Sequence, residues 1–284
     1  MKGCQMPIKL GINGATIPGS DLITGIHVAG AAGFSFYEPR VPRLLECNNA
    51  LGREQAQSSL AGEGLEWLPL NGLENVFSAS PDGIRQAAHE VFDLAEGFGI
   101  GQVIIVPGSV DRAISLAEAQ DTLGALKAIA KEHGVNLLYE FIGFPHHAFS
   151  SLRQAREVTV ASNLPLVLDT FHLAASGTSF EAIQQMGVGE IGLVHLSDAL
   201  VGDRPISEIT DKDRVLSGEG QLPLPDYLRA LAAIGYDGSV SVEVFHPKYE
   251  DIAPGKGARE ALRSACQALD SAGLATSQSE GSSA

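Results

Sequence analysis

The chain has 284 residues, a hydrophobic content of 44% and a formal net charge of −15, from 34 acidic and 19 basic side chains. No run approaches the roughly 18 uninterrupted apolar residues of a membrane span, so we expect no membrane partner. A chain with this negative charge repels the phosphate backbone of a nucleic acid, so we expect no nucleic-acid partner either. Residues 1–10 carry two lysines and continue straight into a strand-like segment, unlike a secretory signal peptide, which favours a cytoplasmic location.

Eight short runs rich in strand-forming residues occur along the chain, and a polar residue, a glycine or a proline closes each of them. The predicted strands are residues 8–13, 34–38, 67–71, 102–107, 136–141, 165–169, 192–196 and 239–245. Near-continuous apolar runs such as residues 103–106 are typical of parallel strands that are buried on both faces.

Stretches with the 3.6-residue periodicity of a helix fill the gaps between these strands. The predicted helices are residues 21–32, 43–61, 81–98, 116–133, 151–162, 179–186, 224–234 and 259–272. Several boundaries carry cap residues: Ser80 precedes Pro81 at a first helical position, and Gly33 and Gly134 follow helices.

Strict alternation of strands and helices predicts parallel strands joined by right-handed crossovers. Eight such units typically need about 250 residues, so we predict a single (β/α)₈ TIM barrel of the α/β class over residues 1–276, followed by a disordered tail at 277–284. An open doubly wound sheet would normally carry a glycine-rich dinucleotide loop after its first strand, and residues 11–16 lack that spacing.

Four consecutive predicted strands, the fifth to the eighth, carry metal-ligand residues at or near their carboxyl ends, where barrel enzymes have their active sites. These residues are Glu140, Asp169, His195 and Glu243. Three carboxylates and one imidazole in one barrel mouth would repel each other if left alone, whereas a divalent cation turns that repulsion into coordination. We therefore predict one divalent metal ion, and the oxygen-rich set favours Mn²⁺, Mg²⁺, Co²⁺ or Zn²⁺ without choosing among them.

Four segments carry a resemblance to a known family: residues 139–145 (Tyr-Glu-Phe-Ile-Gly-Phe-Pro), 168–172 (Leu-Asp-Thr-Phe-His), 205–215, which end in Thr-Asp-Lys-Asp-Arg-Val, and 242–249 (Val-Glu-Val-Phe-His-Pro-Lys-Tyr). With the four candidate ligands, these segments resemble the xylose-isomerase-like barrel superfamily of sugar isomerases and epimerases. The likeness is greatest to its inosose isomerase (2-keto-myo-inositol isomerase) branch. It covers most of the chain and is loosest over residues 21–64.

The resemblance implies a division of labour among the four ligands. Glu140 and Glu243 would bind the metal and also move the substrate proton, whereas Asp169 and His195 would be mainly structural ligands. Moving a carbonyl along a carbon chain requires removal of a proton from carbon, and a metal that grips the oxygens of the substrate lowers that barrier as a Lewis acid. The expected reaction therefore passes through a metal-stabilised enediolate.

Other residues are candidates for substrate contact. His172 lies three residues after Asp169, where its imidazole can reach the substrate oxygen that gains charge. By resemblance, Glu38 and Arg40 at the end of the second strand face the pocket. The connection at 198–221 is unusually long, and long ordered loops at barrel mouths are often lids. Our candidates for substrate or lid contact in that loop are Arg204, Asp213 and Arg214.

We therefore expect a metal-dependent isomerase or epimerase of a small polyhydroxy ketone. The main alternative is a dehydratase of the inosose or dehydroshikimate type, which would use the same metal and proton abstraction but expel water. An abasic-site endonuclease would need further histidine ligands and a basic groove, and a sugar-binding protein would not need two carboxylates poised for proton transfer. The sequence leaves open the metal, the stereochemistry of the substrate and whether the chain forms a homo-oligomer.

Overall fold

The computed structural model of the chain describes residues 8–276, so the predicted tail at 277–284 lies outside the described residues. Within them, the eight predicted strands are confirmed, and the third is divided into two segments. The strands of the barrel are β1 (Lys9–Asn13), β2 (Phe36–Glu38), β3 (Glu66–Trp67), β4 (Leu70–Leu73), β5 (Gln102–Ile105), β6 (Asn136–Glu140), β7 (Leu166–Asp169), β8 (Ile191–Leu196) and β11 (Ser239–Val242). They form one sheet in the order β3-β2-β1-β11-β8-β7-β6-β5-β4, and every pairing in it is parallel.

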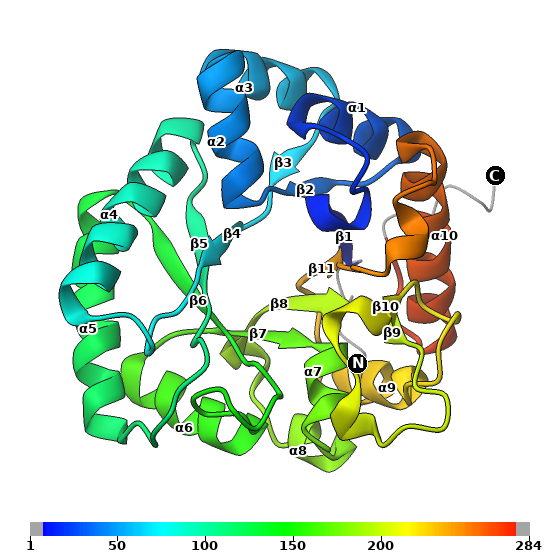
Figure 1. Cartoon of the computed structure of the whole chain (residues 1–284). Coiled ribbons are helices and arrows are strands. Elements are labelled where there is room, and N and C mark those ends of the chain that lie inside the picture. The colour runs from blue at the N-terminus through cyan, green and yellow to red at the C-terminus, as the bar shows by residue number, and fades with distance from the viewer. Residues whose placement is uncertain (1–7, 277–284) are drawn as a thin grey trace, which may run out of the picture.

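The divided third strand closes the barrel. Its first segment, β3, pairs with β2, whereas its second segment, β4, pairs with β5. The backbone of Arg40 also forms a bridge with Asn71, so the two edges of the sheet meet. Figure 1 shows the strands around a central axis with the helices outside them. The predicted single TIM barrel is confirmed as the fold of the described residues.

The outer layer consists of helices that follow the strands. They are α1 (Leu22–Ala32), α2 (Val41–Ala50), α3 (Arg53–Gly62), α4 (Pro81–Phe98), α5 (Leu116–Glu132), α6 (Leu152–Ser162), α7 (Thr170–Ala175), α8 (Phe180–Gln184), α9 (Leu224–Ala233) and α10 (Pro254–Ser271). Ser80 caps α4 as predicted, because its side chain accepts from the Gly83 N–H. Within the described residues, no helix is both long and apolar enough to cross a membrane.

Three helix predictions need correction. The helix predicted at 43–61 is wrong as a single element, because Gly52 adopts a φ of +80° and separates α2 from α3. The last helix begins at Pro254 rather than at residue 259, since a proline in the first turn gives up no intrahelical hydrogen bond. The short helix α7 was not predicted, and it begins directly after Asp169, whose side chain accepts from the Phe171 N–H.

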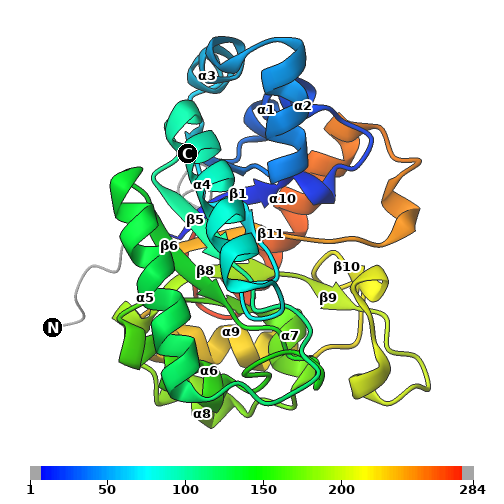
Figure 2. The same cartoon turned by 60° about the vertical axis from the view of Figure 1, so that its left-hand side comes forward.

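The long connection at 198–221 is ordered as a hairpin. Strands β9 (Asp198–Ala199) and β10 (Arg214–Val215) pair in antiparallel fashion, and two 3₁₀ turns, η3 (Ile206–Glu208) and η4 (Asp211–Asp213), lie between them. Figure 2 shows this hairpin standing out from the end of the barrel. The hairpin therefore carries Arg214 from a distant loop to the barrel mouth.

The interior of the barrel is arranged in two layers. The lower layer is apolar and separate from the larger core between sheet and helices, and it contains Phe36, Leu68, Ile104, Leu138, Val167 and Leu193. Because residues i and i+2 of a strand face the same side, the residue two positions later also points inward. In β2, β6, β7 and β8 that residue is Glu38, Glu140, Asp169 and His195 respectively. A polar layer thus lies directly above an apolar floor.

Gly11 of β1 should be sensitive to any added side chain. A Cβ atom there would lie 2.3 Å from Leu68 Cδ1 and 3.0 Å from Phe36 Cβ, both in the apolar floor. We expect Gly11→Ala to lower the free energy of unfolding by about 1–3 kcal/mol, because overpacking forces neighbours to shift. Urea unfolding measures this, with Gly124→Ala as the control.

In the control, no atom lies within 4 Å of the added methyl group, and Gly124 sits on α5. Alanine there should raise the free energy of unfolding by roughly 0.5–1 kcal/mol, since it restricts the unfolded chain. Equal stability of Gly11→Ala and the wild type would show that the floor has room to spare.

Candidate active site

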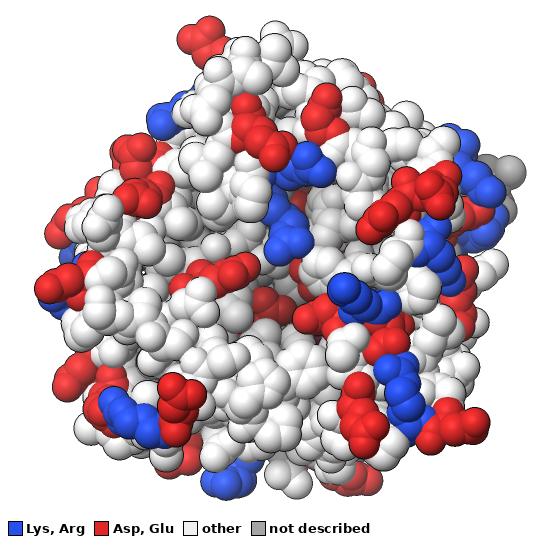
Figure 3. All heavy atoms as spheres, viewed as in Figure 1, with Lys and Arg blue, Asp and Glu red and all other residues white. Residues whose placement is uncertain are grey.

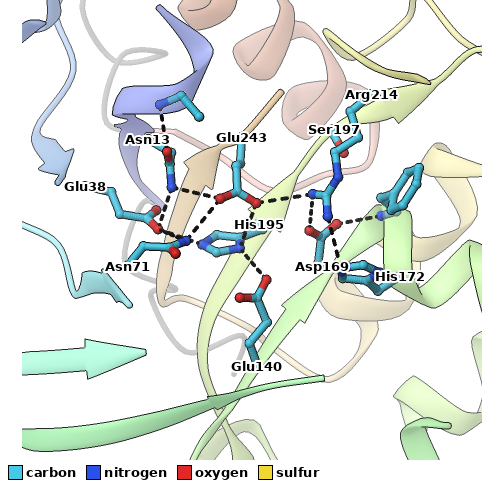
Figure 4. A network of polar contacts seen from close by, with 12 residues as sticks. Asn13, Glu38, Asn71, Glu140, Asp169, His172, His195, Ser197, Arg214 and Glu243 are labelled. Carbon is cyan, nitrogen blue, oxygen red and sulfur yellow. Dashed lines mark hydrogen bonds and ion pairs between the residues drawn. The ribbon is translucent and has the colours of Figure 1, made fainter. Parts of the chain in front are cut away.

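The structure brings the four predicted metal ligands together at the carboxyl ends of neighbouring strands. Glu140 ends β6, Asp169 ends β7, His195 lies near the end of β8 and Glu243 follows β11. Each offers one ligand atom, and these atoms all lie within 4.8 Å of one another. None of the four residues is more than 5% exposed. Figure 4 shows them facing a common centre from different strands.

The electrostatics of this cluster favour a cation. Burial and the neighbouring Glu140 and Glu38 raise the pKa of Glu243, although His195 and Arg214 oppose the shift. Burial alone would lower the pKa of His195, but the carboxylates of Glu38 and Glu243 raise it well above its usual range. Without a metal the cluster therefore gains protons, and a divalent cation would supply the same compensation. The buried donor set thus fits a divalent metal ion.

Arg214 extends into the same cluster from β10. Its Nη1 donates a short hydrogen bond to Asp169 and another of 3.2 Å to Glu243 Oε2, and its Nε donates to Asp211 Oδ1 at 3.0 Å. The guanidinium group lies over the ring of Phe171, 4.4 Å from its centroid. Arg214 is therefore an internal positive charge that contacts two of the four candidate ligands.

His172, at the third position of α7, contacts this arginine. Its Nε2 lies 3.0 Å from Arg214 Nη2, and a guanidinium group only donates, so Nε2 must accept. Burial and the positive charge of Arg214 hold the pKa of His172 well below its usual range, so the ring is neutral and carries its hydrogen on Nδ1. Among the residues that the structure describes, Nδ1 has no hydrogen-bond partner. His172 thus has one buried donor without a partner among the described residues.

A cavity of about 470 Å³ opens above the ligands. Polar residues that line it include Arg40, Asn71, Glu140, His172, Arg214 and Glu243, and its apolar walls include Val106, Ile142, Phe144 and Phe245. Figure 3 shows a hollow at the centre of this face, with acidic side chains inside it and basic side chains at its edge. Its volume and mixed lining suit a small polar molecule.

The candidate substrate contacts fall into two groups. His172, Arg40 and Arg214 line the cavity, and the Arg40 guanidinium group lies 5.3 Å from the ring centroid of Phe245. Arg204 and Asp213 lie outside the lining and bind each other, with Arg204 Nη2 donating to Asp213 Oδ1 at 2.7 Å. Their ion pair secures the hairpin, and a contact with substrate stays a prediction for both.

Glu38 also lies outside the cavity lining. It is 0% exposed, and its Oε1 accepts from His195 Nε2 at 3.0 Å, within the same polar layer as the ligands. Glu38 thus contacts the ligand imidazole in this structure, and its contact with substrate stays a prediction.

Two functional candidates escaped the sequence analysis, Asn13 and Asn71. The Nδ2 group of each donates to both Glu38 Oε1 and Glu243 Oε1, at distances of 2.8–3.1 Å. Both residues close predicted strands, 8–13 and 67–71, so the strand-end criterion also applied to them. The metal-ligand criterion does not select them, because an amide is not ionisable and is neither a strong ligand nor a base.

Comparison with known proteins supports the resemblance to the xylose-isomerase-like barrels. A family model described as a xylose isomerase-like TIM barrel matches residues 26–268. An inosose isomerase of Halalkalibacterium halodurans is 29% identical over 270 residues, which cover 91% of this chain and 94% of that enzyme. A crystal structure of the IolI protein with a bound zinc atom superposes with a TM-score of 0.86 at 28% identity, covering 93% of this chain and 98% of the other.

A more distant relative represents the dehydratase alternative. The 3-dehydroshikimate dehydratase of Pseudomonas putida is 26% identical over 182 residues, which cover 62% of this chain but only 28% of that enzyme. The similarity to the inosose isomerase, in contrast, extends over nearly the full length of both chains.

Proposed function

Because the chain belongs to the xylose isomerase-like TIM barrel family, we propose that it is a metal-dependent isomerase of a small polyhydroxy ketone, and specifically an inosose isomerase of inositol metabolism. One observation carries this proposal. Glu140 Oε1 and Glu243 Oε2 lie 3.2 Å and 3.4 Å from the same atom, Nδ1 of His195, so two carboxylates meet at one buried ligand position. A pair of carboxylates beside one metal suits removal and return of a proton.

Each residue has a defined part in this proposal. One divalent cation would be held by Glu140, Asp169, His195 and Glu243. This ligand set suits Mn²⁺, Mg²⁺, Co²⁺ or Zn²⁺. When bound, the cation supplies Lewis acidity to the oxygens of the substrate. One glutamate would remove a proton from the hydroxyl-bearing carbon beside the carbonyl group, and the other would donate a proton to the carbonyl carbon. The hydroxyl proton would pass to the former carbonyl oxygen, so that the carbonyl group moves by one carbon.

The remaining cavity residues would orient the substrate. The neutral ring of His172 lines the cavity, but its Nδ1–H is buried, so its donation to the oxygen that gains negative charge requires the ring to turn toward the substrate. Arg40 and Arg214 line the cavity with N–H groups that suit hydroxyl and carbonyl oxygens, and the apolar walls limit access of water. The cavity thus supplies donors where the substrate has acceptors.

A dehydratase is the second candidate, because its first step is the same proton removal. It differs only in expelling a hydroxyl group, and the shorter coverage of the dehydratase relative favours the isomerase. An abasic-site endonuclease is disfavoured, since the net charge of −15 opposes DNA and Figure 3 shows acidic and basic side chains interspersed around the mouth.

The decisive experiment is an assay of the purified protein, loaded in turn with each of the four metals, against inososes and ketohexoses in D₂O. We expect NMR to detect an isomer of one inosose, of unchanged heavy-atom composition, with solvent deuterium at the isomerised carbon. A product that has lost one water would identify a dehydratase. If every metal-loaded form left all these substrates unchanged, the proposed function would be wrong.

A further inference from the structure

A buried polar network lies beside the proposed ligands in the same polar layer, on strands across the barrel from most of them. It consists of Asn13 at the end of β1, Glu38 at the end of β2 and Asn71 in β4. Asn13 and Glu38 are 0% exposed and Asn71 is 7% exposed. Figure 4 shows the three side chains converging on Glu243 and His195. Polar groups buried so deeply are costly unless every contact is made, so their partners are informative.

The orientation of the Asn13 amide is fixed by its neighbours. Its Oδ1 accepts from the Ala15 N–H at 2.8 Å, which identifies the other atom as Nδ2. Both hydrogens of Nδ2 are then used, one toward Glu38 Oε1 at 2.8 Å and one toward Glu243 Oε1 at 2.9 Å. An aspartate at this position would face two carboxylates without a donor, so the site requires an amide.

Asn71 makes the same pair of contacts from β4. Its Nδ2 donates to Glu38 Oε1 and to Glu243 Oε1, both at 3.1 Å. Glu243 Oε1 therefore accepts two N–H groups, whereas Oε2 is the oxygen that lies 3.4 Å from His195 Nδ1. The two amides thus hold Glu243 so that a single oxygen faces the ligand cluster.

Glu38 has the corresponding effect on His195. Its Oε1 lies 3.0 Å from Nε2, and a carboxylate only accepts, so when a cation takes the place of the hydrogen on Nδ1, the remaining hydrogen of the imidazole belongs on Nε2. That tautomer directs the lone pair of Nδ1 toward Glu140 and Glu243, whose oxygens lie 3.2 Å and 3.4 Å away. A hydrogen bond from the far ring nitrogen to a carboxylate is a usual means of orienting a histidine ligand.

We propose that Glu38, Asn13 and Asn71 are positioning residues that decide which atoms of His195 and Glu243 face the cation. Glu38 selects Nδ1 of His195, and the two amides select Oε2 of Glu243. The inference rests on the proposed metal-dependent function and adds residues that are neither ligands nor, for Asn13 and Glu38, part of the cavity lining.

The histidine contact is tested by titrating the metal-free protein with Co²⁺ and recording its visible absorption spectrum. Glu38→Gln can keep a carbonyl oxygen near Nε2 but loses the charge, so we expect about 10-fold weaker Co²⁺ binding. Glu38→Leu removes the acceptor, and the loss should reach about 100-fold with an altered spectrum at saturating Co²⁺. The KM for the substrate should stay unchanged in both variants, because Glu38 does not line the cavity.

The Glu243 contact is tested with Asn13→Asp, which keeps the cap to Ala15 but exchanges the two donors for acceptors. We expect turnover at saturating Co²⁺ to fall at least about 10-fold with KM unchanged, because a misaimed Glu243 transfers the proton poorly. The matched control is Ile104→Val in the apolar floor on β5, a strand that carries none of the four ligands. Ile104→Val should lower the melting temperature of the protein and leave its Co²⁺ affinity and the absorption spectrum of the bound Co²⁺ unchanged.

The outcomes separate this inference from the proposed function. If the wild type binds Co²⁺, and Glu38→Gln and Asn13→Asp match it in affinity and turnover, the positioning role is wrong and the proposed function stands. If the wild type itself binds no Co²⁺, both fail together. A raised KM in Glu38→Gln with unchanged Co²⁺ affinity would assign Glu38 to the substrate instead. The expected order, with Glu38→Gln retaining more affinity than Glu38→Leu, would support the proposal even if Glu38→Leu fails to fold.

Discussion

Replacing Glu140 or Glu243 with glutamine should leave the metal bound and lower turnover by roughly 10²–10⁴-fold, the range expected for a group that transfers protons. The amide keeps the size of the side chain and a carbonyl oxygen for coordination, but it is no useful base. Both side chains are almost fully buried and contact His195. Glu140→Gln is the cleaner of the two variants, because Oε1 of Glu243 accepts from Asn13 and Asn71 and Oε2 accepts from Arg214, so an amide nitrogen at position 243 would face a donor. Steady-state kinetics at saturating metal, with metal content measured in the same samples, provides the test.

The control for these variants is Glu54→Gln on α3, an exposed carboxylate far from the cavity, which should keep wild-type turnover. The two buried variants should also lose incorporation of solvent deuterium into the product. Near-normal turnover of Glu140→Gln with metal bound would leave Glu140 as a ligand without a role in proton transfer.

Removing a structural ligand should weaken metal binding rather than impair proton transfer. We expect His195→Ala or Asp169→Ala to weaken Zn²⁺ or Co²⁺ binding by at least about 10²-fold, since even partners of the ligands are worth 10–100-fold. Excess metal should then restore part of the activity. Equilibrium dialysis measures the affinity, and activity is followed as a function of metal concentration.

His195→Ala is the cleaner of these two variants. Asp169 also accepts from the Phe171 N–H at the start of α7, so its removal costs a helix cap worth about 1 kcal/mol as well. His27→Ala on α1, an exposed histidine paired with Glu63, serves as the control and should bind metal normally. An inactive His195→Ala protein that no concentration of metal rescues would contradict the division between structural ligands and proton-transfer groups.

The predictable part of the fold was the alternation of strands and helices, because periodicity over many residues marks each element. The errors lie where periodicity continues across a break. Residues 43–61 keep a helical pattern, yet Gly52 adopts a left-handed φ and divides them, and glycines inside true helices are common enough to hide such a break. Helix α7, with six residues, is too short for a periodic pattern to mark it.

The predictable part of the site was the set of ionisable residues at the strand ends. Glu140 and Glu243 stood out because each is the single charged residue of its predicted strand, and charged residues are rarely buried unless they have a partner. The position of the Arg214 side chain beside the ligands was not predictable. It depends on a hairpin whose strands have only two residues each, which is too short for a hydrophobic pattern to mark them. Asn13 and Asn71 carried the strand-end signal, but their importance follows only from contacts with Glu38 and Glu243, which lie far away in the sequence.

The apolar floor of the barrel also sets how molecules enter and leave. The lumen below the polar layer is filled by apolar side chains, so within the described residues no passage runs through the barrel to its other end, and the cavity opens at the mouth. These side chains are Phe36, Leu68, Ile104, Leu138, Val167 and Leu193. Substrate and product must therefore use the same passage in opposite directions, and one cannot enter until the other has left. We therefore expect the product to be a simple competitive inhibitor, because substrate and product occupy the same binding position in the forward and reverse reactions.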